Sequence, residues 1–332
     1  MIRLGQLGLE FGLKVHVPAF KNDGRFELVS ICSKNTAKAQ IVAHDLNVKH
    51  YTNDPKELFS KVDAVAMAIP PKEQELWLPE AIKSGLHVFF EKPLGFLPSL
   101  NIKMDKKQAL MVDFEFMEID VWKKLKTFID SGKLGEIIHV EVLWNVETDS
   151  VSKGLKSWKT NRQLSGGALN NFGSHVFYYL EELFGPISEI NAKTQPVLGD
   201  GDEVVHLQMN LKTGQLISVC VSTNSFQGSG HRMEVTGTNG TASLWNPIGS
   251  TIGNFELEIH TKSGENLNEK SKWNKESGID DRIRAVESVV KKFGDWIELK
   301  QIKRPNLLEA YRVECLLEVS RKSAENGMSV EI

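Results

Sequence analysis

The chain has 332 residues, 41% of them hydrophobic and 25% charged, which is typical of an ordinary globular protein with room for two domains. Its formal net charge is −3 and no window carries a dense basic stripe, so nucleic acid is not an expected partner. There is no apolar stretch of about 18 residues and no secretory signal pattern, so we expect no membrane partner and a cytoplasmic location. Cys32, Cys220 and Cys315 are widely separated and are expected to be reduced packing residues.

Strand-like and helix-like segments alternate along the first third of the chain. The strand-like segments are 2–7, 26–32, 62–69 and 87–90, and the helix-like ones are 36–46, 55–58 and 73–83. Such alternation predicts βαβ units and a parallel sheet. We therefore predict an α/β fold with an N-terminal Rossmann domain, a doubly wound parallel sheet, over residues 1–113, in which 109–113 form the last strand.

The pattern changes after this point. A helix is predicted at 121–129 and a closing helix at 307–325, and between them lie the alternating stretches 137–146, 187–193, 203–211, 215–223, 231–236 and 241–245. Alternation of this kind is typical of an antiparallel sheet with one covered face. Residues 114–332 are therefore predicted to form an α+β domain with a broad, mainly antiparallel open sheet. Positions such as Val204, His206 and Gln208 leave one face of that sheet for a homodimer or homotetramer.

The apolar run 88–90 ends in Glu91-Lys92-Pro93. Such a run is typical of a buried parallel strand, and it delivers Lys92 to the carboxyl edge of the sheet, where open α/β sheets bind ligands. In isolation, the tripeptide would indicate only a solvated lysine before a proline that ends the strand.

Three further motifs accompany it in a fixed order: Ala-Ile-Pro-Pro at 68–71 followed by Gln74, Ser-Gly-Lys-Leu-Gly-Glu at 131–136, and Gly-Gly-Ala-Leu-Asn-Asn-Phe-Gly-Ser-His at 166–175. With these motifs the chain resembles, over essentially its whole length, the Gfo/Idh/MocA family of NAD(P)-dependent oxidoreductases, which includes glucose-fructose oxidoreductase and inositol dehydrogenase. The resemblance implies a nicotinamide-binding Rossmann domain and a second domain that shapes the pocket for a carbohydrate-like substrate and often forms the oligomer interface.

The glycine loop departs from the usual dinucleotide pattern. A fingerprint needs one glycine for the turn, a second for approach to the pyrophosphate and a third for helix packing. Gly8 stands at the first position and Glu10 at the second; the third falls on Leu13, or on Gly12 if the loop has slipped by one. The Glu10 carboxylate would repel a pyrophosphate unless it points away and only its backbone N–H faces the ligand.

We expect cofactor contacts from this loop, from the segment after the fourth strand and from the Glu-Lys-Pro turn. The residues are Gly8, Leu9, Glu10, Phe11, Gly12, Ile69, Pro70, Pro71, Gln74, Glu91 and Lys92. At the end of the second strand, Ser33 and Lys34 stand where NAD sites generally place an acid. A hydroxyl and a cation suit a 2′-phosphate, so NADP is predicted as the preferred cofactor and NAD as the alternative.

The resemblance also implies catalytic roles. Lys92 and His175 would face the nicotinamide ring, the lysine steering protons and substrate and the histidine exchanging a proton with the reacting hydroxyl. On a helix Asn171 shares a face with His175, although the family often has an aspartate there. It also often has an acid three residues after the histidine, where this chain has Tyr178. The relay is then Lys92 and His175 alone, or Tyr178 assists.

In relatives, the region of Trp158, Lys159 and Arg162 borders the substrate. An aromatic ring with two cations would suit a sugar that carries a carboxylate or phosphate. The alternative is an exposed loop on the rim of the sheet.

The chain carries no phosphate loop, no nucleophile elbow and no histidine at metal-ligand spacing, so neither a hydrolase nor a metal site is predicted. The predicted function is hydride transfer between a nicotinamide and a hydroxyl or ketone carbon of a sugar, sugar acid or cyclic polyol. The alternative, favoured by Glu10 and Asn171, is a catalytically silent relative that acts as a nucleotide- or sugar-binding sensor or as an assembly protein.

Overall fold

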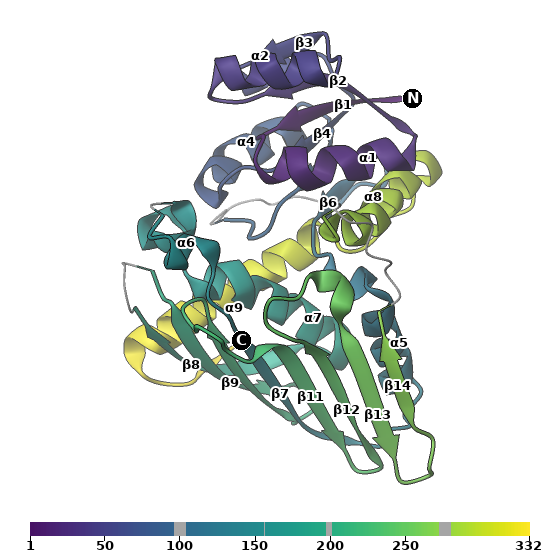
Figure 1. Ribbon diagram of the computed structural model, residues 1–332, viewed down its shortest axis with the longest axis vertical. Coiled ribbons are helices and arrows are strands. Elements are labelled where there is room, and N and C mark those ends of the chain that lie inside the picture. Colours follow the sequence, from purple (N-terminus) through teal and green to yellow (C-terminus); the bar gives the residue numbers. More distant parts are fainter. Residues whose placement is uncertain (96–103, 156, 197–200, 272–279) are drawn as a thin grey trace. The chain divides into compact units, whose positions relative to one another are not determined.

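The computed structural model describes residues 1–95, 104–155, 157–196, 201–271 and 280–332 (Figure 1). The chain divides into two compact units, each with one sheet. The first unit comprises Met1–Glu115 and Glu276–Tyr311, and the second comprises Phe116–Lys275 and Arg312–Ile332.

The sheet of the first unit is parallel throughout. Its strands are β1 (Ile2–Leu7), β2 (Phe26–Cys32), β3 (His50–Thr52), β4 (Ala64–Met67), β5 (His87–Phe90) and β6 (Leu110–Val112). They pair in the order β3-β2-β1-β4-β5-β6, which is the doubly wound Rossmann order. The predicted parallel Rossmann sheet is therefore confirmed.

Helical segments follow most of these strands. They are the π-helical turn η1 (Gly12–His16), α1 (Val17–Asp23), α2 (Thr36–Asp45), α3 (Pro55–Phe59) and α4 (Pro71–Lys83). The amide side chain of Asn35 caps α2 by accepting from Lys38 N, and Asp54 caps α3 by accepting from Lys56 N. These caps fix where each helix begins next to its strand.

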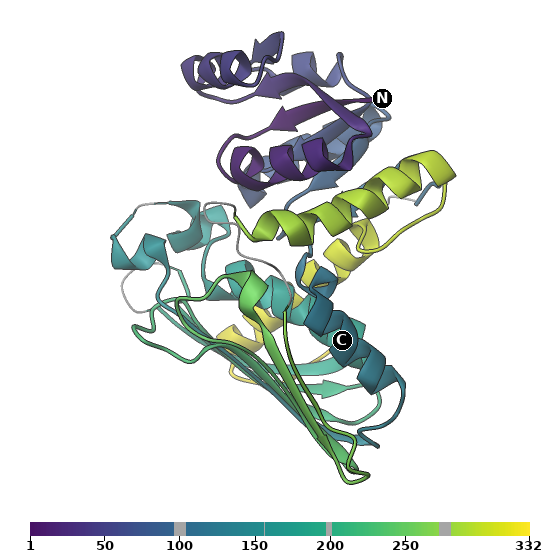
Figure 2. The same cartoon turned by 45° about the vertical axis from the view of Figure 1, so that its right-hand side comes forward.

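A helix from the last third of the chain belongs to this first unit. Helix α8 (Arg282–Leu299) packs against α1, as Figure 2 shows. The ring of Phe293 contacts those of Phe20, Phe26 and Phe89 in one aromatic cluster. This helix lies within the range predicted as the second domain, but it groups with the first unit, because the apolar face of α8 completes the core of the Rossmann sheet.

The second unit contains a nine-stranded sheet in the order β14-β13-β12-β11-β7-β10-β9-β8-β15. All neighbours pair antiparallel except β7 and β10. The broad, mainly antiparallel sheet predicted from alternation is thus confirmed. The strands are β7 (Ile137–Asn145), β8 (Ile187–Gln195), β9 (Val204–Leu211), β10 (Leu216–Ser222), β11 (Gly230–Gly237), β12 (Gly240–Asn246), β13 (Glu256–Thr261), β14 (Leu267–Lys270) and β15 (Val330–Glu331).

The principal helices of this unit lie on one face of its sheet (Figures 1 and 2). They are α5 (Asp120–Asp130), α7 (Ser174–Phe184) and most of α9 (Leu307–Asn326). Inward residues such as Val140, Val219 and Leu257 are buried, while His206 and Glu258 on the opposite face are exposed. The alternation of buried and exposed residues along each strand therefore corresponds to one covered and one open face of the sheet.

Short segments complete the second unit: η2 (Phe116–Glu118), α6 (Asp149–Ser152), η3 (Trp158–Thr160), η4 (Arg162–Leu164), η5 (Leu169–Gly173) and η6 (Ile252–Asn254). All three cysteines are free, and Cys32 is buried. None of the helices in the described part of the chain combines the length and apolar character needed to cross a membrane.

Candidate functional site

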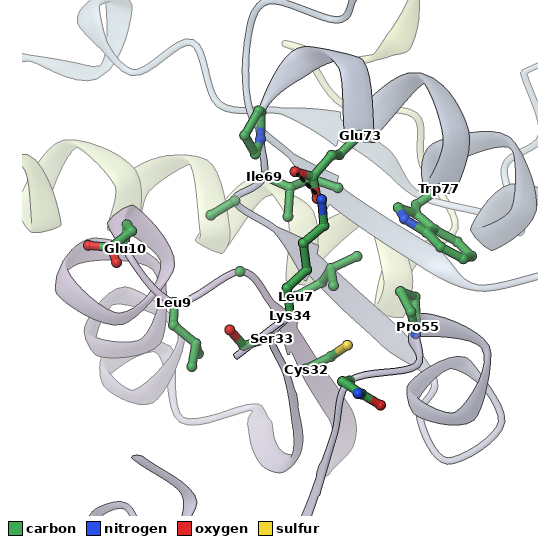
Figure 3. Close-up of a pocket in the computed structure, with 14 residues that line it drawn as sticks. Leu7, Leu9, Glu10, Cys32, Ser33, Lys34, Pro55, Ile69, Glu73 and Trp77 are labelled. Atoms are coloured by element: carbon green, nitrogen blue, oxygen red, sulfur yellow. Dashed lines mark ion pairs between the residues drawn. The ribbon is translucent and has the colours of Figure 1, made fainter. Parts of the chain in front are cut away.

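The first unit has a cavity of about 310 Å³ at the carboxyl ends of β1, β2 and β4 (Figure 3). This is the edge at which doubly wound sheets bind their ligands. Part of the predicted cofactor set lines it: Gly8, Leu9, Glu10, Ser33, Lys34, Ile69 and Pro70. The other lining residues were not predicted: Leu7, Cys32 and Ala68 at the strand ends, and Asn53, Pro55, Glu73 and Trp77.

Gly8 lets the loop after β1 lie against the loop after β4. Its φ is +89°, and a Cβ built on it would lie 2.2 Å from the carbonyl oxygen of Ala68. Gly12 is also tightly enclosed, since a Cβ there would lie 2.2 Å from Nε2 of the buried Gln6. That amide in turn donates to the carbonyl oxygen of Gly8 at 3.0 Å. The loop thus has the tight turn after the first strand that a dinucleotide fingerprint requires.

The Glu10 side chain is turned to solvent. It is 82% exposed and forms an ion pair with Lys38 Nζ of α2, whose hydrogen bond and charge lower the pKa of the carboxyl group. In Figure 3 it lies away from the other lining side chains. This outward orientation is the one in which the Glu10 carboxylate is expected not to repel a pyrophosphate.

Lys34 is held across the cavity. Its Nζ lies 2.8 Å from Oε1 of Glu73 in the first turn of α4 (Figure 3). The Ser33 hydroxyl beside it accepts a hydrogen bond from Asn35 N. The loop after β2 contains no acid. Of the two acids that line the cavity, Glu10 is turned to solvent and Glu73 of α4 pairs with Lys34.

The remaining predicted cofactor residues of the first unit do not line the cavity. Gln74 is fully buried, and its amide donates to the carbonyl oxygens of Glu91 at 2.7 Å and Pro93 at 3.2 Å. Pro71 starts α4 and is buried. Gln74 thereby holds the turn that carries the half-buried Lys92. Phe11 lies under the guanidinium of Arg282, which is 5.0 Å from its ring centroid.

His175 lies on α7 in the second unit and is 5% exposed. The ring of Phe116 meets it edge-on at 4.9 Å, and the Trp144 ring lies 6.0 Å away. Tyr178 is buried on the same helix. Lys92 belongs to the first unit.

Asn171 is tied to the segment that contains the predicted substrate residues. Its amide donates to the carbonyl oxygen of Lys159 at 3.2 Å. Gly166 allows this packing, because a Cβ there would lie 2.1 Å from the carbonyl oxygen of Trp158. The Lys159 ammonium lies 6.0 Å from the Trp158 ring centroid, and Arg162 pairs with Glu325 at 3.0 Å. The structure therefore brings these residues together with Asn171.

Two family models match the chain. The model described as "Oxidoreductase family, NAD-binding Rossmann fold" matches residues 2–107, and the "GFO/IDH/MocA C-terminal domain" matches residues 122–243. The uncharacterized oxidoreductase sll0816 of Synechocystis sp. is 24% identical and covers 96% of this chain and 92% of its own length. The inositol 2-dehydrogenase of Rhizobium meliloti is 25% identical over 74% of this chain and 76% of its own.

Solved structures share the fold. A levoglucosan dehydrogenase in complex with NADH and levoglucosan superposes with a TM-score of 0.85 at 18% identity, and the match covers 100% of this chain and 99% of that one. The Rossmann order of the first sheet, the pocket at its carboxyl edge and the two matched domains together decide the assignment. The chain belongs to the GFO/IDH/MocA oxidoreductase family.

Proposed function

We propose that this protein is an NAD(P)-dependent oxidoreductase that acts on a hydroxyl or ketone carbon of a sugar, sugar acid or cyclic polyol. The observation that carries the proposal is the close approach of Gly8 to Ala68, because this tight turn after β1 brings the backbone of the glycine loop to the carboxyl edge of the sheet, where a pyrophosphate binds. Names of relatives support the substrate class: inositol 2-dehydrogenase and D-xylose dehydrogenase.

The residues present fit a nicotinamide dinucleotide, which would supply or accept the hydride. Gly8 and Leu9 would hold its pyrophosphate, and the indole of Trp77 with Pro55 offers an apolar wall for the adenine. NADP is the preferred form in this proposal, since Lys34 and Ser33 supply a cation and a hydroxyl to the 2′-phosphate. The Glu73 carboxylate would have to give up Lys34 to that phosphate.

In the second part of the proposal, Lys92 and His175 handle the proton that leaves or joins the reacting oxygen. His175 is the general acid and base, and Lys92 orients the substrate oxygen and shares its proton. Asn171 positions the turn that contains Lys159, and Tyr178 assists on the histidine helix. Trp158, Lys159 and Arg162 would border the substrate.

The cofactor assignment is tested by titrating NADPH and NADH with the protein's fluorescence as the signal. Binding of NADPH that is tighter than binding of NADH is the expected result. Equal or weaker binding of NADPH would contradict the NADP preference. If neither cofactor binds at millimolar concentration, the protein is not an NAD(P)-dependent enzyme. Sugars, sugar acids and polyols are then screened by the absorbance of the reduced cofactor. Binding without turnover across the screen would favour a catalytically silent sensor.

Lys92→Ala tests the catalytic assignment. A contact made in the transition state lowers kcat without a matching loss of cofactor affinity, so turnover should disappear while the Kd for NADPH stays nearly unchanged. Lys83→Ala, at the exposed end of α4, is the matched control and should keep full activity. Full activity in Lys92→Ala would refute the role of the lysine.

We also propose that the second sheet forms a homodimer or homotetramer interface through its open face, and that the protein works in the cytoplasm. The open face carries exposed side chains from several adjacent strands, including His206, Gln208 and Ser218. The three free cysteines suit a reducing compartment. Light scattering on the purified protein, with Ser218→Arg as the interface variant, tests the assembly.

A further inference from the structure

A buried histidine of the first unit contacts two carboxylates behind the Glu91-Lys92-Pro93 turn. His16 has no exposed surface, and its Nε2 lies 2.9 Å from Oε1 of Glu91 and 3.3 Å from Oδ2 of Asp113. Glu91 immediately precedes Lys92, and Asp113 follows β6 at the same edge of the sheet. The imidazole thus joins the strand ends of β5 and β6.

The imidazole is fixed on its faces as well as at its nitrogen. The rings of Phe11 and Phe89 meet it edge-on, with centroid distances of 5.3 and 5.1 Å. The backbone on the other side of Lys92 is fixed by Gln74, whose amide donates to the carbonyl oxygens of Glu91 and Pro93. Both ends of the turn are therefore held by side chains that come from helical segments.

The charges of the cluster favour a protonated histidine. Burial lowers the pKa of His16, but its hydrogen bonds to Asp113 and Glu91 outweigh this, and the pKa is raised from 6.5 to about 9. The other ionisable groups that act on the cluster are Glu115, Lys92 and Arg282. An uncharged residue in place of His16 would leave Glu91 and Asp113 to repel each other in a buried setting.

We propose that His16 is a positioning residue for Lys92: by bridging the Glu91 and Asp113 carboxylates, it sets the backbone from which the lysine side chain extends and balances the negative charge beside it. Without this bridge, the Asp113 carboxylate would draw the Lys92 ammonium toward itself and away from a substrate oxygen. This inference rests on the proposed function, in which Lys92 acts on the substrate.

Three variants separate the contributions of His16. His16→Gln keeps a donor of similar reach but removes the charge, His16→Phe removes both, and Asp113→Asn removes one of the two partners. His44→Gln, on the exposed surface of α2, is the matched control. Near-ultraviolet circular dichroism and the NADPH titration establish that each variant is folded.

The first readout needs no substrate. Short pulses of acetic anhydride at pH values from neutral to alkaline label free amines, and mass spectrometry gives the rate at Lys92 against those at Lys83 and Lys107. The labelling rate depends on the charges around the amine and on its exposure, so His16→Phe should change the labelling of Lys92 by about threefold or more. His16→Gln should show a smaller change, and Lys83 and Lys107 should not change.

The second readout is the pH profile of kcat, for which a misplaced lysine predicts a loss of about 10²-fold in His16→Phe with a nearly unchanged Kd for NADPH. If the substrate screen finds nothing and the labelling of Lys92 still depends on His16, the proposed function fails and the positioning role stands. Unchanged labelling in the folded His16→Phe protein would overturn the inference. So would a change in Lys92 labelling when wild-type protein is treated with a chelator, because His16, Glu91 and Asp113 would then be metal ligands.

Discussion

Nζ of Lys34 lies 2.8 Å from Oε1 of Glu73, so an ion pair closes across the cavity in which a cofactor ribose would sit (Figure 3). The lysine side chain is 78% exposed and the glutamate side chain 26%. A pair this accessible to water is worth at most about 1 kcal/mol, so a phosphate group can replace the carboxylate at little expense.

Cofactor discrimination should therefore change in opposite directions when the two partners are altered. Lys34→Ala should weaken NADPH binding by about tenfold, the equivalent of about 1.4 kcal/mol, and leave NADH binding nearly unchanged. Glu73→Gln should strengthen NADPH binding, because it frees the lysine and removes a like charge near the phosphate. Fluorescence titrations of both cofactors measure the ratio, with Lys83→Ala as the control. A parallel loss of NADH and NADPH affinity in Lys34→Ala would contradict phosphate binding by this lysine.

The glycine loop offers a matched pair of substitutions. Gly8 and Gly24 have φ values of +89° and +77°, but a Cβ at Gly24 would meet nothing within 4 Å. Gly24→Ala should therefore lose only about 1 to 2 kcal/mol of stability, the cost of placing a residue with a Cβ in the left-handed conformation. Gly8→Ala should be destabilised further and should lose cofactor binding, because its Cβ would collide with the Ala68 carbonyl oxygen. Urea unfolding and the NADPH titration measure both effects; equal behaviour of the two variants would show that the close approach is unimportant.

The stability of the protein should fall as the pH rises. Glu115 is buried, and burial together with the nearby Asp113 charge raises its pKa from 4.5 to about 8. The folded protein therefore keeps this proton to a higher pH than the unfolded chain does. The contribution of Glu115 to the free energy of unfolding is complete below about pH 4.5 and is lost as the pH rises through about 8. The raised pKa of His16 likewise makes stability fall as the pH rises, here between about pH 6.5 and 9.

Glu115→Gln should flatten the lower part of this dependence. The variant carries no charge to bury, so its Tm should exceed that of the wild type near pH 8 and approach it near pH 5, while the decline due to His16 remains at higher pH. Differential scanning calorimetry across this range measures the effect. Glu27→Gln, on the exposed side of β2, is the control. A parallel pH dependence of wild type and Glu115→Gln would rule out a buried, protonated Glu115.

Replacing Asn171 with aspartate, the residue that the family resemblance implies at this position, should harm this protein. The Asn171 amide donates to the carbonyl oxygen of Lys159, and a carboxylate would instead face that oxygen without a proton to share. Asn171→Asp should lose about 1 kcal/mol or more of stability and expose the Lys159 and Arg162 peptide bonds to trypsin. Asn268→Asp on the exposed part of β14 is the control. Higher activity and unchanged proteolysis in Asn171→Asp would contradict this prediction and would show that an aspartate at this position improves catalysis.

The two sheets could be predicted because their strands bury either every residue or every second one. Strand β5 is a continuous apolar run, and β9 and β10 alternate, so each pattern indicated its sheet type. Strand β13 was not predicted, since Leu257 and Ile259 are its only buried positions between charged neighbours. The helical spacing of α8 is present in the sequence, but spacing cannot tell which core a helix joins.

The orientation of individual side chains at the site could not be predicted. Glu10 pairs with Lys38, which is 28 residues away in the chain. Lys34, in the loop after β2, pairs with Glu73 of α4. His16 and Asp113 are 97 residues apart and come together only through the strand order. The glycine loop and the motif at 68–71 do line the cavity, whereas the charge pairs within it depend on tertiary contacts.

The position of α8 also dictates the order in which the protein can mature during synthesis. The ribosome makes the six Rossmann strands early, but the surface formed by Phe20, Phe26 and Phe89 stays uncovered until Phe293 and its neighbours emerge some 200 residues later. Strands β7 to β14 of the second sheet are translated in that interval, whereas β15 and α9 follow α8. The nucleotide-binding unit, although encoded first, is thus completed late, and a chain that stops before α8 presents an aromatic surface to chaperones and to aggregation.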